Sequence, residues 1–480
     1  MDSLLVFKEL VKTAKIRPES SAIHDSYGTL SYAELLEEVH KVRYQLISRG
    51  VRSGHAVGVK ARNSRNFIVS VFAVLGCGAA VMPISHQLKR RELDEILELA
   101  RLHALIDDSS GIVPIQENRI ELNVDSGSLF FSNTSISSEE QFAPYVDAPA
   151  FIRFTSGTTG SSKGVVIDNQ AVIDRTDAAN KALKLNDSSN VICVLPMAYH
   201  FVVSIVLYVR VGAAITIVKN FMAKDIITMT NKFFGTLLYA SPMQIRLLAT
   251  DQGAEMLDSL EMVISTSSGI SKEISNLFRK RFHKTVHQAF GIIEVGLPII
   301  NREEGAEYLD YVGTPLPDFD VQVFDEDYNK LPAGQVGLLG IKGPGMFAAY
   351  LNPSEIRQDI LINGYFFSAD YAVISENGMV KIEGRKKSMI NIAGNKVFAE
   401  EVELVLEELE CINKAKVSGI AHQLLGQIIQ AEIITEDGFD IDEENILSYC
   451  RKHLSTFKIP QKLIVVDEFK MTDSGKLIRH

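Results

Sequence analysis

Ten consecutive residues rich in glycine, serine and threonine constrain the fold of this chain more than any other segment. Residues 155–164 read TSGTTGSSKG, and apolar runs typical of strands lie on either side, at 150–154 and 165–167. Glycine allows a backbone to approach a ligand closely, and successive N–H and hydroxyl groups can donate to phosphate oxygens. Lys163 adds a positive charge suited to phosphate. The segment predicts a strand–loop–strand unit whose loop binds an anionic ligand.

This loop differs from the P-loop of many nucleotide-binding proteins. The pattern GxxxxGK[ST] is not matched, and a predicted strand follows the segment where a P-loop has a helix. A flexible surface turn is the simplest alternative, but an unbroken run of this composition that ends in Lys-Gly argues against it.

Predicted strands and helices alternate along most of the 480 residues, which indicates an α/β fold. The chain is 46% hydrophobic and long enough for two or three packed units. An amphipathic helix is predicted at 32–49 and a short strand at 56–60, while the polar, serine-rich residues 124–142 are predicted to form an exposed loop. From 313 to 341, short β-type runs separated by proline and glycine predict a β-rich subdomain.

A second, smaller domain is predicted towards the C-terminus. Its boundary is expected at the basic run GRKK, residues 384–387. The helix-like and strand-like segments that follow are sufficient for an α+β domain of about a hundred residues. We therefore expect a large N-terminal domain at 1–385, made of α/β subdomains and the β-rich subdomain, and a small C-terminal α+β domain at 386–480.

Net charge and cysteine spacing exclude several classes of protein. The formal net charge of −11 argues against a nucleic-acid-binding protein, because such a protein needs a basic face. The four cysteines are far apart and lack CxxC spacing, so we expect reduced thiols in a cytoplasmic protein, without disulfides or a zinc site. The N-terminus lacks the features of a signal peptide. The apolar run 67–84 contains two glycines and a proline, which predicts a buried helix and strand and no membrane span.

The segment TSGTTGSSKG resembles the phosphate loop of the adenylate-forming superfamily, which includes acyl- and aryl-CoA synthetases, peptide-synthetase adenylation domains and luciferases. Other motifs similar to those of the superfamily follow in the same order, beginning with TLSYAEL at 29–35, so the resemblance covers nearly the whole chain. It implies ATP and Mg²⁺ as cofactors and a small C-terminal domain that is mobile. The loop residues that it assigns to the nucleotide are Thr155, Ser156, Gly157, Thr158, Thr159, Gly160 and Lys163.

The segment QAFGIIE at 288–294 is similar to the superfamily motif YGxTE. By this resemblance Phe290 and Gly291 lie beside the adenine, and Glu294 is a catalytic residue that holds Mg²⁺ on the triphosphate. Gly269 is expected in the wall around the adenine. Ile293 stands where the superfamily usually has threonine, so one hydroxyl donor to phosphate is missing from the motif.

The segment YFFSAD at 365–370 resembles the superfamily motif YxTGD, with alanine in place of glycine at position 369. The resemblance implies that Asp370 accepts hydrogen bonds from the ribose hydroxyls. It also implies that Arg385 contacts the same sugar or a phosphate.

Three further positions are assigned by the resemblance to domain movement and catalysis. Lys387 falls at the hinge of the small domain, and Gly394 would line the tunnel for the thiol. The segment TDSGK at 472–476 matches the last motif, TxxGK, which makes Lys476 the catalytic lysine that bridges the substrate carboxylate and the α-phosphate.

The pocket for the acid is expected partly from the segment after Leu195-Pro196, again by resemblance. No acidic residue occurs at 197–206 or 239–243, whereas peptide-synthetase domains for α-amino acids usually place an aspartate near the latter segment. The pocket is therefore expected to be apolar and aromatic, although core packing explains some of its aromatic residues equally well. Its candidate wall residues are Tyr199, His200, Tyr239, Ser241 and Met243.

Together these features predict an ATP-dependent ligase that activates an apolar acyl or aryl carboxylic acid as acyl-AMP and transfers it to a thiol. CoA is the preferred acceptor, and the phosphopantetheinyl group of a carrier protein is the alternative. A luciferase-like oxygenase and a non-catalytic nucleotide-binding protein are two further alternatives. The presence of Lys163, Glu294, Asp370 and Lys476 argues against the non-catalytic alternative.

Overall fold

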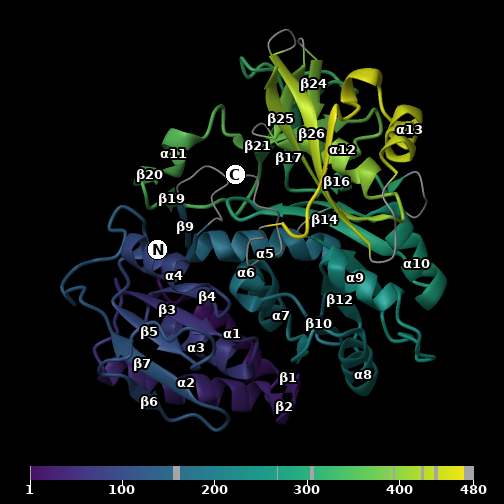
Figure 1. The fold of residues 1–480 in the computed structure, drawn as a ribbon. Coiled ribbons are helices and arrows are strands. Elements are labelled where there is room, and N and C mark those ends of the chain that lie inside the picture. Colours follow the sequence, from purple (N-terminus) through teal and green to yellow (C-terminus); the bar gives the residue numbers. More distant parts are fainter. Residues whose placement is uncertain are drawn as a thin grey trace.

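The computed structural model describes residues 2–154, 163–266, 269–302, 308–385, 388–392, 395–422, 426–436 and 442–469. Within these residues the chain has the predicted α/β fold, with a large N-terminal part and a small C-terminal part (Figure 1). In Figure 1 the N-terminal strands lie in the lower half in purple and blue, and the C-terminal sheet lies at the top in green and yellow.

The first nine-stranded sheet contains the strands on either side of the glycine-rich segment. In spatial order its strands are β20 (Glu355–Ile356), β19 (Ala349–Tyr350), β9 (Gly164–Asp168), β8 (Pro149–Phe154), β4 (Ala80–Ser85), β3 (Ala56–Ala61), β5 (Ala104–Asp107), β7 (Leu129–Asn133) and β6 (Ile120–Leu122). Strands β8 and β9 pair antiparallel, with Phe154 opposite Gly164. The glycine-rich segment therefore connects two adjacent strands, as predicted.

The second nine-stranded sheet is parallel from β1 to β14. In spatial order its strands are β16 (Thr314–Pro315), β15 (Gly296–Asn301), β14 (Val286–Ile292), β13 (Met262–Ser265), β12 (Leu237–Ala240), β10 (Asn190–Cys193), β11 (Ala214–Ile217), β1 (Ser21–Asp25) and β2 (Gly28–Ser31). Parallel strands end at the same edge of a sheet, and ligands of α/β proteins bind beyond their carboxyl ends. The loops after β12, β13 and β14 therefore lie together at one edge.

The main hydrophobic core fills the space between these two sheets. It joins residues of the first sheet, such as Val59, to residues of the second sheet, such as Ile215, through helices that bury Val39, Phe72 and Val172. The α-helices are α1 (Leu5–Ile16), α2 (Tyr32–Ser48), α3 (Arg65–Gly76), α4 (Arg90–Ala100), α5 (Asn169–Leu183), α6 (Met197–His200), α7 (Val206–Val211), α8 (Ala223–Phe233), α9 (Pro242–Ala249), α10 (Lys272–Phe282), α11 (Arg357–Ile360), α12 (Ala399–Leu406) and α13 (Glu443–His453). Helices α8, α9 and α10 cover the outer face of the second sheet, and α4 covers that of the first.

Two local predictions are confirmed by the N-terminal elements. The motif TLSYAEL forms the end of β2 and the start of α2, where Ser31 and Glu34 each accept a hydrogen bond from the other's backbone N–H, at 3.2 and 2.7 Å. The apolar run 67–84 forms most of α3 and β4, and both elements are buried. The turn between them uses Gly78, whose φ of +73° favours glycine.

The serine-rich residues 124–142 were expected to form an exposed loop, and this prediction is wrong in part. Residues Leu129–Asn133 form β7, which pairs antiparallel with β5 and β6. Leu129 and Phe131 are buried in the main core, while the ring of Phe130, between them, lies 3.7 Å from the guanidinium carbon of Arg119. The burial of Leu129 and Phe131 on one face of β7 outweighs the polar composition of the surrounding sequence.

A four-stranded antiparallel sheet forms the predicted β-rich subdomain. Its strands are β17 (Asp320–Phe324), β18 (Val336–Lys342), β21 (Phe366–Ile374) and β22 (Val380–Arg385). This sheet presents Asp370 and Arg385 as directly opposed residues of β21 and β22.

The C-terminal part has its own five-stranded sheet and its own core. The strands are β24 (Asn395–Phe398), β23 (Met389–Ile392), β26 (Gly426–Thr435) and β25 (Ile412–His422), with β27 (Lys462–Val465) parallel to β26. Helices α12 and α13 pack on it through residues such as Val402 and Ile446. Phe398 contacts Tyr371 of the four-stranded sheet, with ring centroids 5.4 Å apart. The small part is thus a separate hydrophobic unit that touches the β-rich subdomain.

The sequence predicts neither a membrane span nor a disulfide. In the part of the chain that the structure describes, no helix combines the length and the apolar composition needed to cross a membrane. All four cysteines are free thiols.

Candidate active site

Lys163 follows the predicted phosphate loop and is the one loop residue of the predicted nucleotide set that lies within the described residues. Its ammonium nitrogen lies 4.5 Å from the centroid of the Tyr350 ring. Tyr350 is placed there by pairing of the short strand β19 with β9, in which Tyr350 lies opposite Val165. The ring face carries partial negative charge and therefore holds the lysine without neutralising it.

Glu294 lies on the turn between β14 and β15, next to the same tyrosine. The Tyr350 hydroxyl donates to Glu294 Oε1 at 3.1 Å, so Tyr350 contacts both Lys163 and Glu294. Burial raises the pKa of the Glu294 carboxyl, while the charges of Arg175 and Arg385 act in the opposite direction. A cation at this carboxylate would therefore relieve a desolvation cost.

Arg175 fixes the backbone that carries Glu294. This fully buried arginine of α5 donates from Nε to the Gly345 carbonyl at 2.8 Å and from Nη1 to the Ile293 carbonyl at 3.1 Å. The backbone N–H of Phe347 also donates to the Glu294 carbonyl at 2.7 Å. These bonds hold the turn after β14 against the segment that leads into β19.

Asp370 and Arg385 form an ion pair at the edge of the β-rich subdomain. Arg385 Nε lies 3.2 Å from Asp370 Oδ1, and the aspartate side chain is 5% exposed whereas that of the arginine is 47% exposed. The charge of Arg385 opposes the rise that burial causes in the pKa of Glu294, which indicates that the Asp370–Arg385 pair lies near Glu294. Ala369 has a φ of +62°, a left-handed conformation that favours glycine, the residue of the superfamily motif here.

The residues present fit Mg²⁺ brought in by a nucleotide. No cluster of three or more histidine, cysteine or acidic side chains that could hold a metal occurs within the described ranges. A single half-buried carboxylate, Glu294, beside a lysine suits Mg²⁺, which commonly uses one or two protein carboxylates together with phosphate oxygens.

The residues predicted for the adenine wall lie at the carboxyl ends of β13 and β14. Phe290 is half-buried near the end of β14, and Gly291 follows it, where a Cβ would meet the Gly296 carbonyl oxygen at 2.7 Å. Gly269 is exposed after β13, and a Cβ there would have no atom within 4 Å. These residues lie at the strand-end edge, with open space beside Gly269.

Two of the residues predicted for the acid pocket, His200 and Tyr239, lie next to each other. His200 ends α6 and meets the ring of Tyr239 of β12 edge-on, with centroids 6.2 Å apart. A narrow cavity of about 10 Å³ adjoins both rings. It has room for about one water molecule in this conformation. Its lining consists of Val191, Ile192, Cys193, Leu195, Met197, His200, Ser204, Ile205, Tyr208 and Tyr239.

Backbone irregularity accompanies this pocket. A π-helical turn, Phe201–Ile205, follows α6 directly, and such turns are frequent at functional sites. Asn63 holds the preceding segment by donating to the Leu195 carbonyl and accepting from the Met197 N–H, both at 2.8 Å. The cavity wall is thus fixed at one end and irregular at the other.

Two other predicted pocket residues lie elsewhere around β12. Ser241 caps α9 by accepting from the Gln244 N–H at 3.4 Å, and the Met243 side chain is 62% exposed. Neither lines the cavity described above. Their roles in binding the acid remain predictions.

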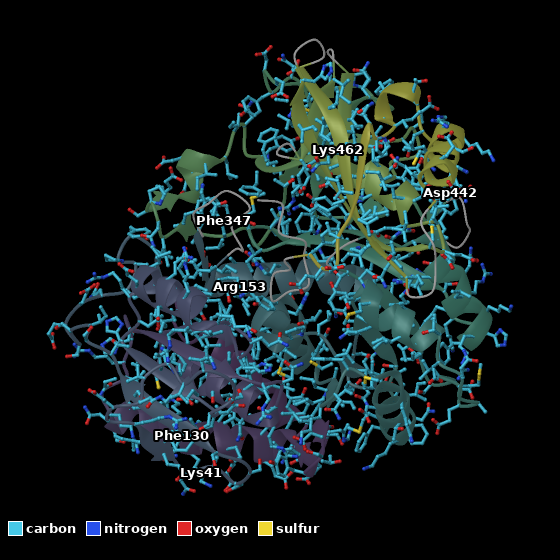
Figure 2. The ribbon with its side chains drawn as sticks, viewed as in Figure 1. Lys41, Phe130, Arg153, Phe347, Asp442 and Lys462 are labelled. Atoms are coloured by element: carbon cyan, nitrogen blue, oxygen red, sulfur yellow. The ribbon has the colours of Figure 1, made fainter. Side chains whose placement is uncertain are left out.

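Three site residues were missed by the sequence analysis. Tyr350 and Arg175 lie outside any recognised motif, and no local pattern marks them. Arg153 does carry a signal, because it is a single charge in an apolar strand immediately before the phosphate loop. Its guanidinium carbon lies 4.1 Å from the ring centroid of Tyr199, and Figure 2 shows it near the middle of the molecule, close to Phe347 in this view.

Several predicted residues lie outside the described residues. They are Thr155, Ser156, Gly157, Thr158, Thr159, Gly160, Lys387, Gly394 and Lys476.

Comparisons with known proteins cover nearly the whole chain. The family model for AMP-binding enzyme matches residues 10–351, and that for AMP-binding enzyme C-terminal domain matches residues 401–476. The 2-succinylbenzoate–CoA ligase of Geobacillus sp. is 26% identical, with 98% of this chain and 96% of that protein covered. Gramicidin S synthase 2 of Brevibacillus brevis is 25% identical over 99% of this chain, which spans 11% of that protein. The solved structure of the amide bond synthetase McbA from Marinactinospora thermotolerans has a TM-score of 0.85 at 20% identity, with 99% of this chain and 98% of that chain covered.

Proposed function

This chain belongs to the AMP-binding enzyme family, and from that premise we propose that it activates a carboxylic acid as an acyl-adenylate and transfers the acyl group to the thiol of CoA. One observation carries this proposal. Lys163, Glu294 and the Asp370–Arg385 pair come from three separate motifs, yet Tyr350 contacts the first two and the charge of Arg385 acts on Glu294. A site with this distribution of charge suits a nucleoside triphosphate.

In the first half-reaction a carboxylate oxygen of the acid attacks the α-phosphorus of ATP. The bond between the α-phosphorus and the bridging oxygen breaks, and pyrophosphate leaves. Lys163 offsets the charge of the phosphates, and Asp370 orients the ribose. Mg²⁺, held by Glu294, would neutralise part of the triphosphate charge. Lys476 would bridge the carboxylate and the α-phosphate as negative charge moves between them.

In the second half-reaction the thiol sulfur attacks the acyl carbon. The bond between that carbon and the AMP oxygen breaks, so that the products are a thioester, AMP and a proton. We propose that the small domain turns about Lys387 between the half-reactions and brings Gly394 to the thiol. This alternation would remove Lys476 from the site once the adenylate has formed.

The chemical character of the cavity beside His200 and Tyr239 supports an acid with an apolar body, for which the cavity has to widen from its volume of about 10 Å³. Its lining consists of aliphatic and aromatic side chains with a histidine, a serine and a cysteine, and none of the residues around it is acidic. An ammonium group would find no carboxylate partner in this lining. We therefore propose an acyl or aryl acid in preference to an α-amino acid.

A carrier protein is the second candidate acceptor. It is favoured by the match over 99% of this chain to gramicidin S synthase 2, a peptide synthetase. The phosphopantetheine of a carrier protein presents the same thiol as CoA. The first half-reaction would be unchanged by this alternative.

Carboxylate-dependent exchange of pyrophosphate into ATP, measured without thiol, tests the first half-reaction. The panel contains fatty, aryl, dicarboxylic and α-amino acids. We expect exchange with acyl or aryl acids and none with α-amino acids. Absence of exchange with every acid, in a protein that binds ATP, would contradict the proposal. Thioester formation with CoA and with loaded carrier proteins then separates the two acceptors.

A further inference from the structure

Arg153 lies on the same face of β8 as Phe151 and contacts the segment that carries the predicted pocket residues Tyr199 and His200. Side chains alternate along a strand, and Phe151, two residues earlier, faces the core between the two large sheets. The Phe151 ring contacts Phe201 at 6.0 Å between centroids, and the Arg153 guanidinium lies over Tyr199 at 4.1 Å. Both contacted residues belong to the segment that carries His200.

Arg153 differs in its hydrogen-bond partners from two other arginines with little exposed surface, Arg175 and Arg65. Arg175 donates to backbone carbonyls, and Arg65 donates to Asp25 from Nε at 2.8 Å. For Arg153, no hydrogen bond or ion pair to another side chain or backbone group occurs among the described residues, and the Tyr199 ring is its contact. Burial lowers its pKa to about 10, so it stays charged at neutral pH. Arg153 is half-buried, and a half-buried guanidinium that has no counterion among the described residues favours an anion.

The missing anion is not supplied by the pocket wall. Arg153 and Tyr199 lie next to the cavity beside His200 without lining it. The residues that do line it include no aspartate or glutamate, and the sequence has none at 197–206 or 239–243. The partner of Arg153 must therefore come from a ligand or from residues outside the described ranges. The described cations on the nucleotide side have other neighbours, because Lys163 faces Tyr350 and Arg385 pairs with Asp370.

We propose that Arg153 binds a second anionic group on the substrate, and that the preferred acid is a dicarboxylic acid with an apolar body. The proposal deepens the proposed function and rests on it. The reacting carboxylate is assigned to Lys476, so a fixed guanidinium over Tyr199 is available for the other end of the acid. A planar guanidinium binds carboxylate through two parallel hydrogen bonds, which lysine cannot reproduce.

The test compares matched acids in the pyrophosphate exchange assay. The pairs are butanoate with succinate, hexanoate with adipate, and benzoate with terephthalate, which differ in one carboxylate. The variants are Arg153→Met, which keeps the bulk, and Arg153→Lys, which keeps the charge. Arg246→Met, an exposed position on α9, is the matched control.

We expect the wild type to prefer at least one diacid over its monoacid. Arg153→Met should lower kcat/KM for that diacid about a hundredfold, through loss of a charged pair. The same variant should leave the monoacid and the KM for ATP within about twofold. Arg153→Lys should recover part of the loss.

Three results would overturn the proposal. A wild type that exchanges with monoacids alone would contradict the inference and leave the proposed function standing. An equal loss for every acid together with a raised KM for ATP would assign Arg153 to the nucleotide. No exchange with any acid would contradict the proposed function, and the inference with it. If Arg153→Met does not fold, stabilisation of the wild type by the diacid over the monoacid in a thermal unfolding assay with ATP decides the same question.

Discussion

The proposed nucleotide side and the proposed acid side of this site differ in how their charged groups are partnered. On the nucleotide side each charged group that the structure describes already has a protein neighbour: Lys163 has Tyr350, Glu294 has the Tyr350 hydroxyl, and Asp370 has Arg385. On the proposed acid side the cavity wall is aliphatic and aromatic, and within the described part of the chain Arg153 contacts an aromatic ring and no counterion. The comparison indicates that the protein can hold the charged side chains for ATP in place before the ligand binds, because ATP is the same in every reaction. In this proposal, recognition of the acid depends on a cavity and on the charge of Arg153.

The largest expected effect concerns Lys476, the lysine proposed to bridge the acid and the α-phosphate. Lys476→Ala should reduce adenylate formation by about a hundredfold to a thousandfold, the usual cost of removing one donor to developing charge. ATP binding, measured by calorimetry, should change little because the remaining nucleotide contacts are intact. Lys462→Ala, an exposed lysine of β27, is the matched control. Unchanged turnover in Lys476→Ala would remove the assigned role.

The second prediction concerns how the KM values for Mg–ATP and for the acid depend on pH. Burial raises the pKa of Glu294, so this carboxyl stays protonated to a higher pH than an ordinary glutamate. Because Mg²⁺ binding needs the ionised form, the KM for Mg–ATP should rise about tenfold per pH unit as pH falls below that raised pKa. Glu294→Gln should raise the KM for Mg–ATP at neutral pH and abolish the part of its pH dependence that comes from ionisation of Glu294. The KM for the acid, measured in parallel, should not follow the same titration; identical profiles for both substrates would break the comparison.

A smaller effect is expected from the tyrosine that joins Lys163 to Glu294. Tyr350→Phe removes the hydroxyl that donates to Glu294 Oε1 and keeps the ring beside Lys163. A hydrogen bond to a charged group is worth about 1.5–3 kcal/mol, so the KM for Mg–ATP should rise about tenfold or more. Tyr365→Phe, which also loses a hydroxyl bonded to a carboxylate, that of Asp320, is the control. If Tyr350→Phe changes the KM for the acid and leaves the KM for Mg–ATP unchanged, the assignment of Tyr350 to the nucleotide is wrong.

The smallest effect is on stability. Ala369 has a φ of +62°, which costs a residue with a Cβ about 1–2 kcal/mol, whereas glycine adopts it freely. Ala369→Gly should therefore stabilise the protein by up to about 1 kcal/mol, once the greater unfolded-state entropy of glycine is subtracted. Ala372→Gly, in the same strand without a positive φ, should destabilise it. Urea unfolding midpoints measure both changes, and equal shifts of the same sign would contradict the explanation.

The architecture could be predicted from sequence because its signals are local. The run 67–84 shows its helix and strand through two glycines and a proline, and the TLSYAEL segment shows a helix start through Ser31 and Glu34. The prediction of an exposed loop for the serine-rich segment failed because the pairing of β7 with β5 is a tertiary contact that outweighs local composition.

The site could be predicted only where motifs carry it. Glu294 and Asp370 stand in recognisable segments, whereas Arg175 reaches Ile293 across 118 positions in the sequence and Tyr350 meets Glu294 across 56. No local pattern reports such contacts. Ile293, the departure from the superfamily motif, is half-buried beside the main core while its carbonyl accepts from Arg175. Its backbone role is thus independent of the side chain that the motif specifies.

Transfer of an oxygen isotope tests the central claim most directly. The acid that the exchange panel selects is labelled with ¹⁸O in its reacting carboxylate and incubated with ATP, Mg²⁺ and CoA, and the nucleotide product is examined by mass spectrometry. If that carboxylate attacks the α-phosphorus, the product is AMP that carries one ¹⁸O atom from the acid. Release of ADP with the label in inorganic phosphate, or AMP without label, would contradict formation of an acyl-adenylate.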